Sequence, residues 1–323
     1  MRFPWVRITG TIVRRTAFAA LTVWIVSLVV FGALNILPAD PTTAALGPEA
    51  TPEMRAAYRH LMNLDLPPIP RYLRWAGGML RGDFGISVVS RNPIGPELAQ
   101  RAALTAVLGL ASLLLSVVLA LPLAVRSARR AGRLFDVTIS AAAIAVSAVP
   151  EFVVAIGMIV VFVSGLRAFP VSSNGIAEGD LGALVLPVLT LTLGAAAYVF
   201  RHARVSVIET MSAPYVRTAV LNGFSPARIL WFHVMPNAAV VVVNAVALNA
   251  ITLLSGVIVV ESVFGYPGLG QLLVQALVAN DFPKIEAVAV VTTALLVVIN
   301  LLADGVVLIL DPRLRTQVAS APR

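Results

Sequence analysis

Few side chains in this sequence could support covalent or metal chemistry. The 323 residues include no cysteine and only three widely separated histidines, His60, His202 and His233. Neither a thiolate metal site nor a disulfide can form, and a histidine cluster for a metal is not expected. The one lysine, Lys284, stands in DFPKIE with no glycine loop before it. This sequence therefore has no G-x-x-x-x-G-K-[ST] loop for nucleotide phosphates, and any ATPase that drives the protein must be another polypeptide.

A second group of polar residues stands inside long apolar stretches. Glu151 follows Pro150 in SAVPEF. A carboxylate at membrane depth is costly, so it requires a partner, a water-filled cavity or a role in transport. Asn249, Thr252 and Gly256 share one face of a later stretch, where they either let helices pack closely or line a passage. We take Glu151, Asn249, Thr252 and Gly256 as candidate residues of a pathway.

The elements that must position these residues are apolar helices. Hydrophobic residues make up 59% of the chain and charged residues 12%, whereas a soluble domain has about half and about a quarter. A helix needs about 20 apolar residues to cross a bilayer. We predict an all-α polytopic membrane protein with six transmembrane helices, at residues 16–37, 104–125, 138–166, 183–200, 238–260 and 285–310.

Arginine placement predicts the orientation of these helices. If the N-terminus is cytoplasmic, the cytoplasmic segments carry most of the 24 Lys and Arg residues, as the positive-inside rule requires. The same rule accounts for the net charge of +8 without a nucleic-acid partner. Both termini are then cytoplasmic, and the first apolar stretch is too long for a signal peptide. We expect a first helix with its N-terminus at 1–37, an extracytoplasmic subdomain at 38–103, a core at 104–311 with a cytoplasmic loop at 209–237, and a cytoplasmic tail at 312–323.

Two short helices are expected outside the spans. Thr51 suits an N-cap with Pro52 at the first helical position. The apolar residues 271–279 form a helix too short to span, which fits a re-entrant or surface helix at the outer mouth. The loop before it is a candidate outer gate or scaffold, with Glu261, Pro267, Gly268 and Gly270 as its marked residues.

The segment RTAVLNGFSPARILWFHVMP interrupts the apolar pattern after the fourth stretch. Ser212 can cap a helix that Gly223 ends in a left-handed conformation. Ser225 can cap a second helix that begins at Pro226. We expect neither helix to be long enough to cross the membrane. The apolar side chains of this unit require cover from a membrane surface or a protein groove: Val216, Ala219, Val220, Phe224 and Trp231.

The spacing of this segment resembles the cytoplasmic loop of bacterial ABC-importer permeases, the binding-protein-dependent transport system inner-membrane components. Arg217, Thr218 and Ala219 occupy the place of an E-A-A-like triad, Gly223 is the glycine that follows it, and the residues 233–236 form the close. The R-T-A form is similar to the subgroup that serves dipeptides, oligopeptides and nickel. Four further stretches resemble the same subgroup: LPADP, RGDFGISVVSRNPIGPEL, VVESVFGYPGLGQLL and INLLADGVVLILDPRLR.

The resemblance implies the fold of an ABC type I importer in a bacterial plasma membrane. Two such permeases pair, usually as a heterodimer, and each forms half of the translocation pathway. Two separate ATPase subunits, or one fused chain, hold ATP and Mg and bind the cytoplasmic loops, while an extracytoplasmic binding protein delivers the substrate. The substrate is a peptide by resemblance, with nickel chelates, glutathione and oligosaccharides left open. The resemblance assigns ATPase docking to Arg217, Thr218, Ala219, Gly223, Phe224, Ser225 and Pro226.

Two other classes of function deserve comparison. A transporter that works alone on an ion or substrate gradient needs a relay of ionisable groups within the membrane, and only Glu151 and Asp304 lie deep enough. An intramembrane enzyme needs a nucleophile with a base or a metal motif. The sequence has no cysteine, no histidine pair and no H-E-x-x-H motif. We therefore expect a transport subunit that is not itself an enzyme.

Overall fold

The computed structural model describes residues 5–36, 42, 46, 47, 49–61, 64–170 and 172–310. Within these ranges the chain is almost entirely helical, and the β-type pairing found there is a single bridge between Ile86 and Pro93. The chain forms two compact units, each described separately below. The first unit comprises Ala106–Tyr266 with the described parts of 1–13 and 299–323, and the second comprises Arg14–Thr105 and Pro267–Val298.

Among the described residues, five helices are long and apolar enough to cross a membrane, and a bent pair of helices supplies a sixth candidate. Helices are the expected form of such segments, because the bilayer core offers no water to pair with backbone groups. The helical segments are α1 (Trp5–Ile36), α5 (Ile94–Ala128), α6 (Leu134–Ala148), α7 (Glu151–Met158), α8 (Gly182–Met211), α11 (Met235–Phe264) and α13 (Phe282–Leu310). The fold is thus the predicted all-α membrane architecture.

Several predicted spans are shorter than the helices that contain them. The span predicted at 183–200 ends well before Met211, where α8 ends, and α5 begins before the span predicted at 104–125. Hydropathy locates only the apolar part of a helix, whereas the helix continues into more polar sequence. The end of the first predicted span, Leu37, lies outside the described residues.

The third predicted span is a pair of helices rather than one kinked helix. Helix α6 ends at Ala148, Val149 adopts an extended conformation, and α7 begins at Glu151 with Pro150 as its N-cap. The two segments meet at an angle of 102°. Pro150 stands at the start of the new helix, because its fixed φ and missing N–H suit a helix start better than an interior. A π-helical segment, Ile159–Gly165, continues α7.

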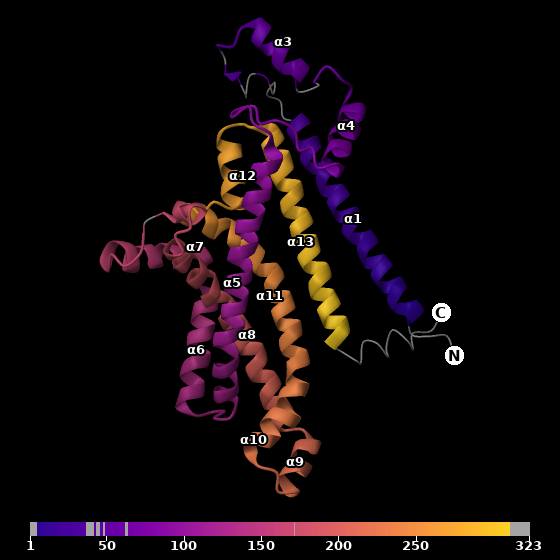
Figure 1. The fold of residues 1–323 in the computed structure, drawn as a ribbon. Helices are drawn as coiled ribbons and strands as arrows, with labels where there is room; N and C mark the ends of the chain where they lie inside the picture. Colours follow the sequence, from indigo (N-terminus) through magenta and orange to yellow (C-terminus); the bar gives the residue numbers. More distant parts are fainter. Residues whose placement is uncertain are drawn as a thin grey trace. The chain divides into compact units, whose positions relative to one another are not determined.

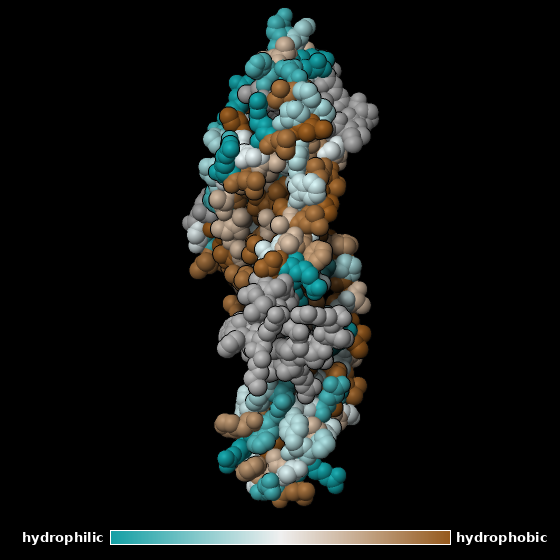
Figure 2. Space-filling view, turned by 90° about the vertical axis from the view of Figure 1, so that its right-hand side faces the viewer, coloured by the Kyte–Doolittle hydropathy of each residue, from teal (hydrophilic) through white to brown (hydrophobic). Residues whose placement is uncertain are grey.

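The first unit is built around α8 and α11, which pack along each other, with α6 and α7 against α8 (Figure 1). The buried cluster of this unit includes several small residues, among them Ala143 of α6 and Ala197 and Ala203 of α8. Such residues let helix backbones approach closely where lipid provides no hydrophobic drive for helix association. On the far side of α5, large apolar side chains at Leu110, Leu114 and Val118 are exposed. Hydrophobic side chains are likewise prominent on the surface in Figure 2, as expected for a chain that contacts lipid.

The second unit contains the short helices α3 (Pro52–Leu61), α4 (Pro68–Leu80) and α12 (Leu269–Val278). The predicted cap of α3 is present, since the Met54 N–H donates to Thr51 Oγ1 at 3.3 Å. Helix α12 corresponds to the short apolar helix predicted at 271–279. The Leu269 N–H at its start donates to the buried Thr105 Oγ1 at 2.8 Å, which fixes this helix against the start of α5.

Candidate functional site

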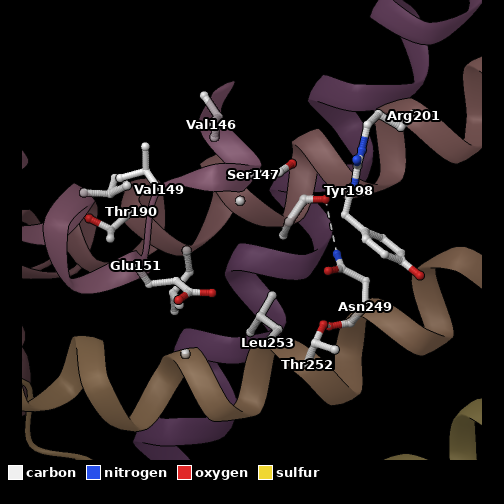
Figure 3. A pocket seen from close by; sticks show the side chains of 15 residues that line it. Val146, Ser147, Val149, Glu151, Thr190, Tyr198, Arg201, Asn249, Thr252 and Leu253 are labelled. Atoms are coloured by element: carbon white, nitrogen blue, oxygen red, sulfur yellow. Dashed lines mark hydrogen bonds between the residues drawn. The ribbon is translucent and has the colours of Figure 1, made fainter. Parts of the chain in front are cut away.

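A cavity of about 260 Å³ lies inside the first unit at the break between α6 and α7. Its wall is formed by the end of α6, the start of α7 and facing stretches of α8 and α11 (Figure 3). The structure brings all four candidate pathway residues, Glu151, Asn249, Thr252 and Gly256, to this one wall. Their role in transport remains a prediction.

Glu151 reaches the cavity because α7 starts at this residue and departs from the direction of α6. Its side chain is exposed. A Cβ atom placed on Gly256 would lie 3.5 Å from Glu151 Cγ and 3.3 Å from Leu191 Cδ2. The glycine therefore leaves the space that Glu151 and Leu191 occupy, which is a packing role as well as a lining role.

Asn249 and Thr252 also combine packing with lining. Asn249 is buried, and its Nδ2 donates to the Ala195 carbonyl of α8 at 3.3 Å. The Thr252 hydroxyl donates to the Asn249 carbonyl at 3.0 Å. The amide thus ties α11 to α8, and the same face borders the cavity; that this face lines a passage stays a prediction.

Sequence reasoning missed the contribution of α8 to this wall. Thr190, Gly194, Tyr198 and Arg201 line the cavity from α8, together with Ser147 at the end of α6. The sequence pattern that could have identified the four residues of α8 is their spacing of four, four and three residues, which places them on one helical face. The span predicted at 183–200 stops one residue before Arg201, whereas α8 continues to Met211.

The cytoplasmic-loop candidate folds as a compact helical turn at the end of α8. Helix α9 (Pro214–Leu221) follows α8 after Ser212, and Gly223 adopts the expected left-handed conformation with φ +77°. Ser225 caps α10 (Pro226–Ile229) by accepting from the Arg228 N–H at 3.4 Å. The cap predicted at Ser212 is wrong: this residue ends α8, its hydroxyl donates to the Ile208 carbonyl, and Ala213 precedes α9.

The second helix of this turn is not a separate short helix, as was expected. Helix α10 passes through a π-helical turn, Leu230–Val234, directly into α11. The whole stretch Pro226–Phe264 forms one helical segment of 39 residues. Pro236 does not end this segment; it lies directly after the π-helical turn, as the second residue of α11.

The apolar side chains of this turn divide into two sets. Val216 and Ala219 were expected to need an outside partner, but they are buried against Val207, Ile229 and Val234 of the same chain. Thr218 and Arg228 lie on its surface, where the Arg228 guanidinium stacks over Phe224 at 4.7 Å. The set that is exposed in the described part of the chain is Tyr215, Val220, Leu221, Trp231 and Phe232. We call this set the apolar face of the turn.

The four outer-loop candidates belong to two units: Glu261 to the first, and Pro267, Gly268 and Gly270 to the second. Glu261 is buried near the end of α11, and its carbonyl accepts from the Tyr266 N–H at 2.8 Å. Burial raises the pKa of Tyr266, with the nearby Glu261 carboxylate contributing, so this phenol stays neutral. The chain passes to the second unit at Pro267, where Gly268 is the N-cap of α12 and Gly270 lies in its first turn.

One charged cluster was not foreseen from the sequence. Asp136, in the first turn of α6, is almost fully buried. Its carboxylate accepts from Arg204 Nε at 2.5 Å, from Arg204 Nη2 at 2.6 Å, from the Gly132 N–H at 2.9 Å and from the Ser127 hydroxyl. Asp136 thereby connects the end of α5, the following turn and α8. No group of three or more His, Cys, Asp or Glu side chains in the described part of the chain could hold a metal.

Comparison with known proteins identifies the family. Residues 116–316 match the family "Binding-protein-dependent transport system inner membrane component", and residues 8–108 match its N-terminal family. The chain is 33% identical over 309 residues to the probable peptide ABC transporter permease protein y4tP of Sinorhizobium fredii, with 94% of this chain and 98% of that protein covered. Two further relatives share the same coverage. They are the oligopeptide transport system permease protein AppB of Bacillus subtilis, 30% identical, and the glutathione transport system permease protein GsiC of Escherichia coli, 31% identical.

These matches exclude the alternatives of a gradient-driven transporter and an intramembrane enzyme, because the relatives are permease subunits of ABC transporters. A permease of this kind works in the bacterial plasma membrane with ATPase and binding-protein partners. The chain belongs to the family of binding-protein-dependent transport system inner membrane components and is a transmembrane permease subunit of an ABC importer.

Proposed function

We propose that this permease forms half of the pathway by which an ABC importer takes up peptides. Three relatives support the substrate class, since two are named for peptides or oligopeptides and one for glutathione. The observation that carries the proposal is the cavity between α6, α7, α8 and α11, where polar and charged side chains interrupt otherwise apolar helices. Ligand sites in proteins have this character: mostly apolar walls with a few polar groups that set orientation.

The proposed function also implies the partners of this permease. A second, homologous permease would supply the other half of the pathway, and a binding protein on the outer side would deliver the peptide. Two ATPase subunits, or one fused chain, would hold ATP and Mg. Both termini of this chain would then be cytoplasmic, together with the turn formed by α9 and α10.

The turn formed by α9 and α10 is the proposed docking site for an ATPase subunit. Its inner side is fixed by Val216 and Ala219, which pack on the helices below. Its apolar face is exposed and needs cover, which a groove on the ATPase would provide. Because α10 continues into α11, a movement of the docked turn is passed on to the helix that carries Asn249, Thr252 and Gly256. Arg217, Thr218, Gly223, Phe224, Ser225 and Pro226 complete the proposed docking set with Ala219 as its inner support.

Uptake by a reconstituted importer tests the proposed function. Proteoliposomes that contain this permease, its partner permease and the ATPases should accumulate trialanine when ATP is inside and the binding protein is outside. Vesicles with this chain alone should show neither uptake nor ATP hydrolysis, even with a proton gradient. Accumulation of a nickel chelate or an oligosaccharide with no accumulation of any peptide would contradict the proposed substrate class. Uptake by the chain alone would contradict the assignment as a subunit.

A further inference from the structure

Two ionisable side chains line the cavity without a charged partner among the described residues. No described residue forms a hydrogen bond or an ion pair with the Glu151 carboxylate or the Arg201 guanidinium, and Arg201 Nε is buried without any hydrogen-bond partner. An arginine in such a position is usually paired with a carboxylate, as Arg204 is one helical turn further along α8, where both of its hydrogen bonds go to Asp136. Charges left unpaired near the apolar interior are costly and mark functional positions. Among the described residues, the cavity therefore presents Glu151 and Arg201 as two side chains of opposite charge type that have no charged partner.

The separation of the two groups limits what they can hold together. Glu151 lies at the level of Leu191, because the position of a Gly256 Cβ is 3.5 Å from Glu151 Cγ and 3.3 Å from Leu191 Cδ2. Ten residues of α8 separate Leu191 from Arg201, which corresponds to a rise of about 15 Å. Figure 3 shows the two side chains well apart in the cavity, with Ser147 displayed between them and Thr252 on the neighbouring helix α11. Glu151 and Arg201 are thus placed to bind two ends of one solute rather than each other.

We propose that this cavity holds a short peptide with its ammonium group at Glu151 and its carboxylate at Arg201. The proposal rests on the proposed function and adds a recognition rule to it. An extended tripeptide spans at most about 11 Å, and a hydrogen bond of about 3 Å at each end brings its reach to about 17 Å. This length matches the rise along α8. A guanidinium suits a carboxylate because it offers two parallel N–H donors.

The wall between the two charged ends suits a peptide backbone. The Ser147 hydroxyl donates to the Ala143 carbonyl at 2.8 Å and the Thr252 hydroxyl donates to the Asn249 carbonyl. Each hydroxyl oxygen keeps its acceptor capacity, so it can accept from a peptide N–H. The remaining wall is largely apolar, with Leu191 and Leu253 among its side chains. Such a wall selects for the free termini of a peptide and tolerates different side chains.

Binding of trialanine and of two blocked forms tests the proposal directly. The permease is assembled with its partner permease and ATPases in nanodiscs, without the binding protein, so that only the membrane cavity selects the ligand. Equilibrium dialysis should show that N-acetyl-trialanine and trialanine amide each bind about tenfold or more weakly than trialanine, the loss expected for one charge-assisted hydrogen bond. Equal binding of the three peptides, or no binding of trialanine, would overturn the proposal without any variant.

Two variants test which side chain binds which terminus of the peptide. In Glu151→Gln, N-acetyl-trialanine should bind as well as trialanine, whereas trialanine amide should still bind more weakly. In Arg201→Gln, trialanine amide should bind as well as trialanine, whereas N-acetyl-trialanine should still bind more weakly. Asp65→Asn and Arg133→Gln remove exposed charges outside the cavity and should preserve both discriminations. Discrimination that persists in both cavity variants would overturn the assignment. If the complete importer takes up trialanine in that case, the proposed function stands and only the recognition rule fails; if it takes up no peptide, the proposed function itself fails.

Discussion

At the scale of single residues, Asp136 shows how one carboxylate can fix the ends of several helices. It is almost fully buried, yet four donors from Arg204, Ser127 and Gly132 surround it. A buried charge is costly unless it is paired and hydrogen-bonded, and here both of its oxygens are satisfied. The cluster is a structural element rather than a pathway element, since neither Asp136 nor Arg204 lines the cavity.

Asp136→Asn should destabilise the protein. The amide keeps the shape of the side chain but leaves the Arg204 guanidinium without its countercharge, so we expect the free energy of unfolding to fall by about 3 kcal/mol. Thermal unfolding in detergent measures the change. Asp65→Asn, at an exposed position, is the matched control and should change stability by less than about 0.5 kcal/mol. Equal stability of the two variants would show that the cluster contributes little.

At the scale of elements, the turn between α9 and α10 depends on one backbone conformation. Gly223 has φ +77°, and no atom lies within 4 Å of the position of a Cβ there. A larger residue at position 223 is therefore disfavoured by strain in the backbone and not by steric clashes of its side chain. The left-handed conformation costs roughly 1–2 kcal/mol for a residue with a Cβ, and proline cannot adopt it at all.

Gly223→Pro should leave membrane insertion intact and reduce ATP-driven uptake by tenfold or more, with Gly223→Ala intermediate. The turn would lose the geometry that presents its apolar face, so the ATPase should co-purify in smaller amounts. The control is Gly305→Ala, at a helical glycine of α13 that also has free space around its Cβ position. Normal ATPase binding and uptake by Gly223→Pro would contradict the assignment of this turn as the docking site.

The sequence predicted element types better than it predicted element ends and contacts. Gly223, Ser225 and Pro226 encode their turn locally, because φ, side-chain capping and the missing N–H are properties of single residues. Glu151, Asn249, Thr252 and Gly256 could be chosen because polar groups are rare in apolar helices. The position of Arg201 in the cavity could not be predicted, because it depends on how far α8 continues. The burial of Val216 could not be predicted either, because it depends on which helices meet. The 102° angle after Ala148 likewise requires tertiary contacts.

At the scale of the whole molecule, the central question is which segments face which side of the membrane. The distribution of arginine predicts that the turn at 214–229 is cytoplasmic and that α4 lies on the outer side. The chain has no native cysteine, so single cysteines report accessibility without background. Leu80 in α4 and Leu221 in α9 are 91% and 79% exposed, respectively, which makes them a matched pair.

In intact cells, a membrane-impermeant maleimide should label Leu80→Cys and not Leu221→Cys. In inside-out vesicles the pattern should reverse, because the opposite membrane face is then accessible. Both variants should label equally after detergent solubilisation, which controls for thiol reactivity. Labelling of Leu221→Cys in intact cells would place the turn outside and would exclude its contact with an ATPase.

The π-helical turn Leu230–Val234 sets the angular register between the two ends of the segment Pro226–Phe264. A π-turn accommodates one residue more than an α-helical turn, and one residue corresponds to about 100° of rotation around a helix axis. Loss of a single residue in this turn would therefore restore an ordinary α-helical turn and leave the faces of α10 and α11 in register. Loss of one residue from the α-helical stretch between Met235 and Asn249 would instead rotate α10 by about 100° relative to Asn249 and Gly256, so the π-helical turn is the place in this segment where chain length could change by one residue.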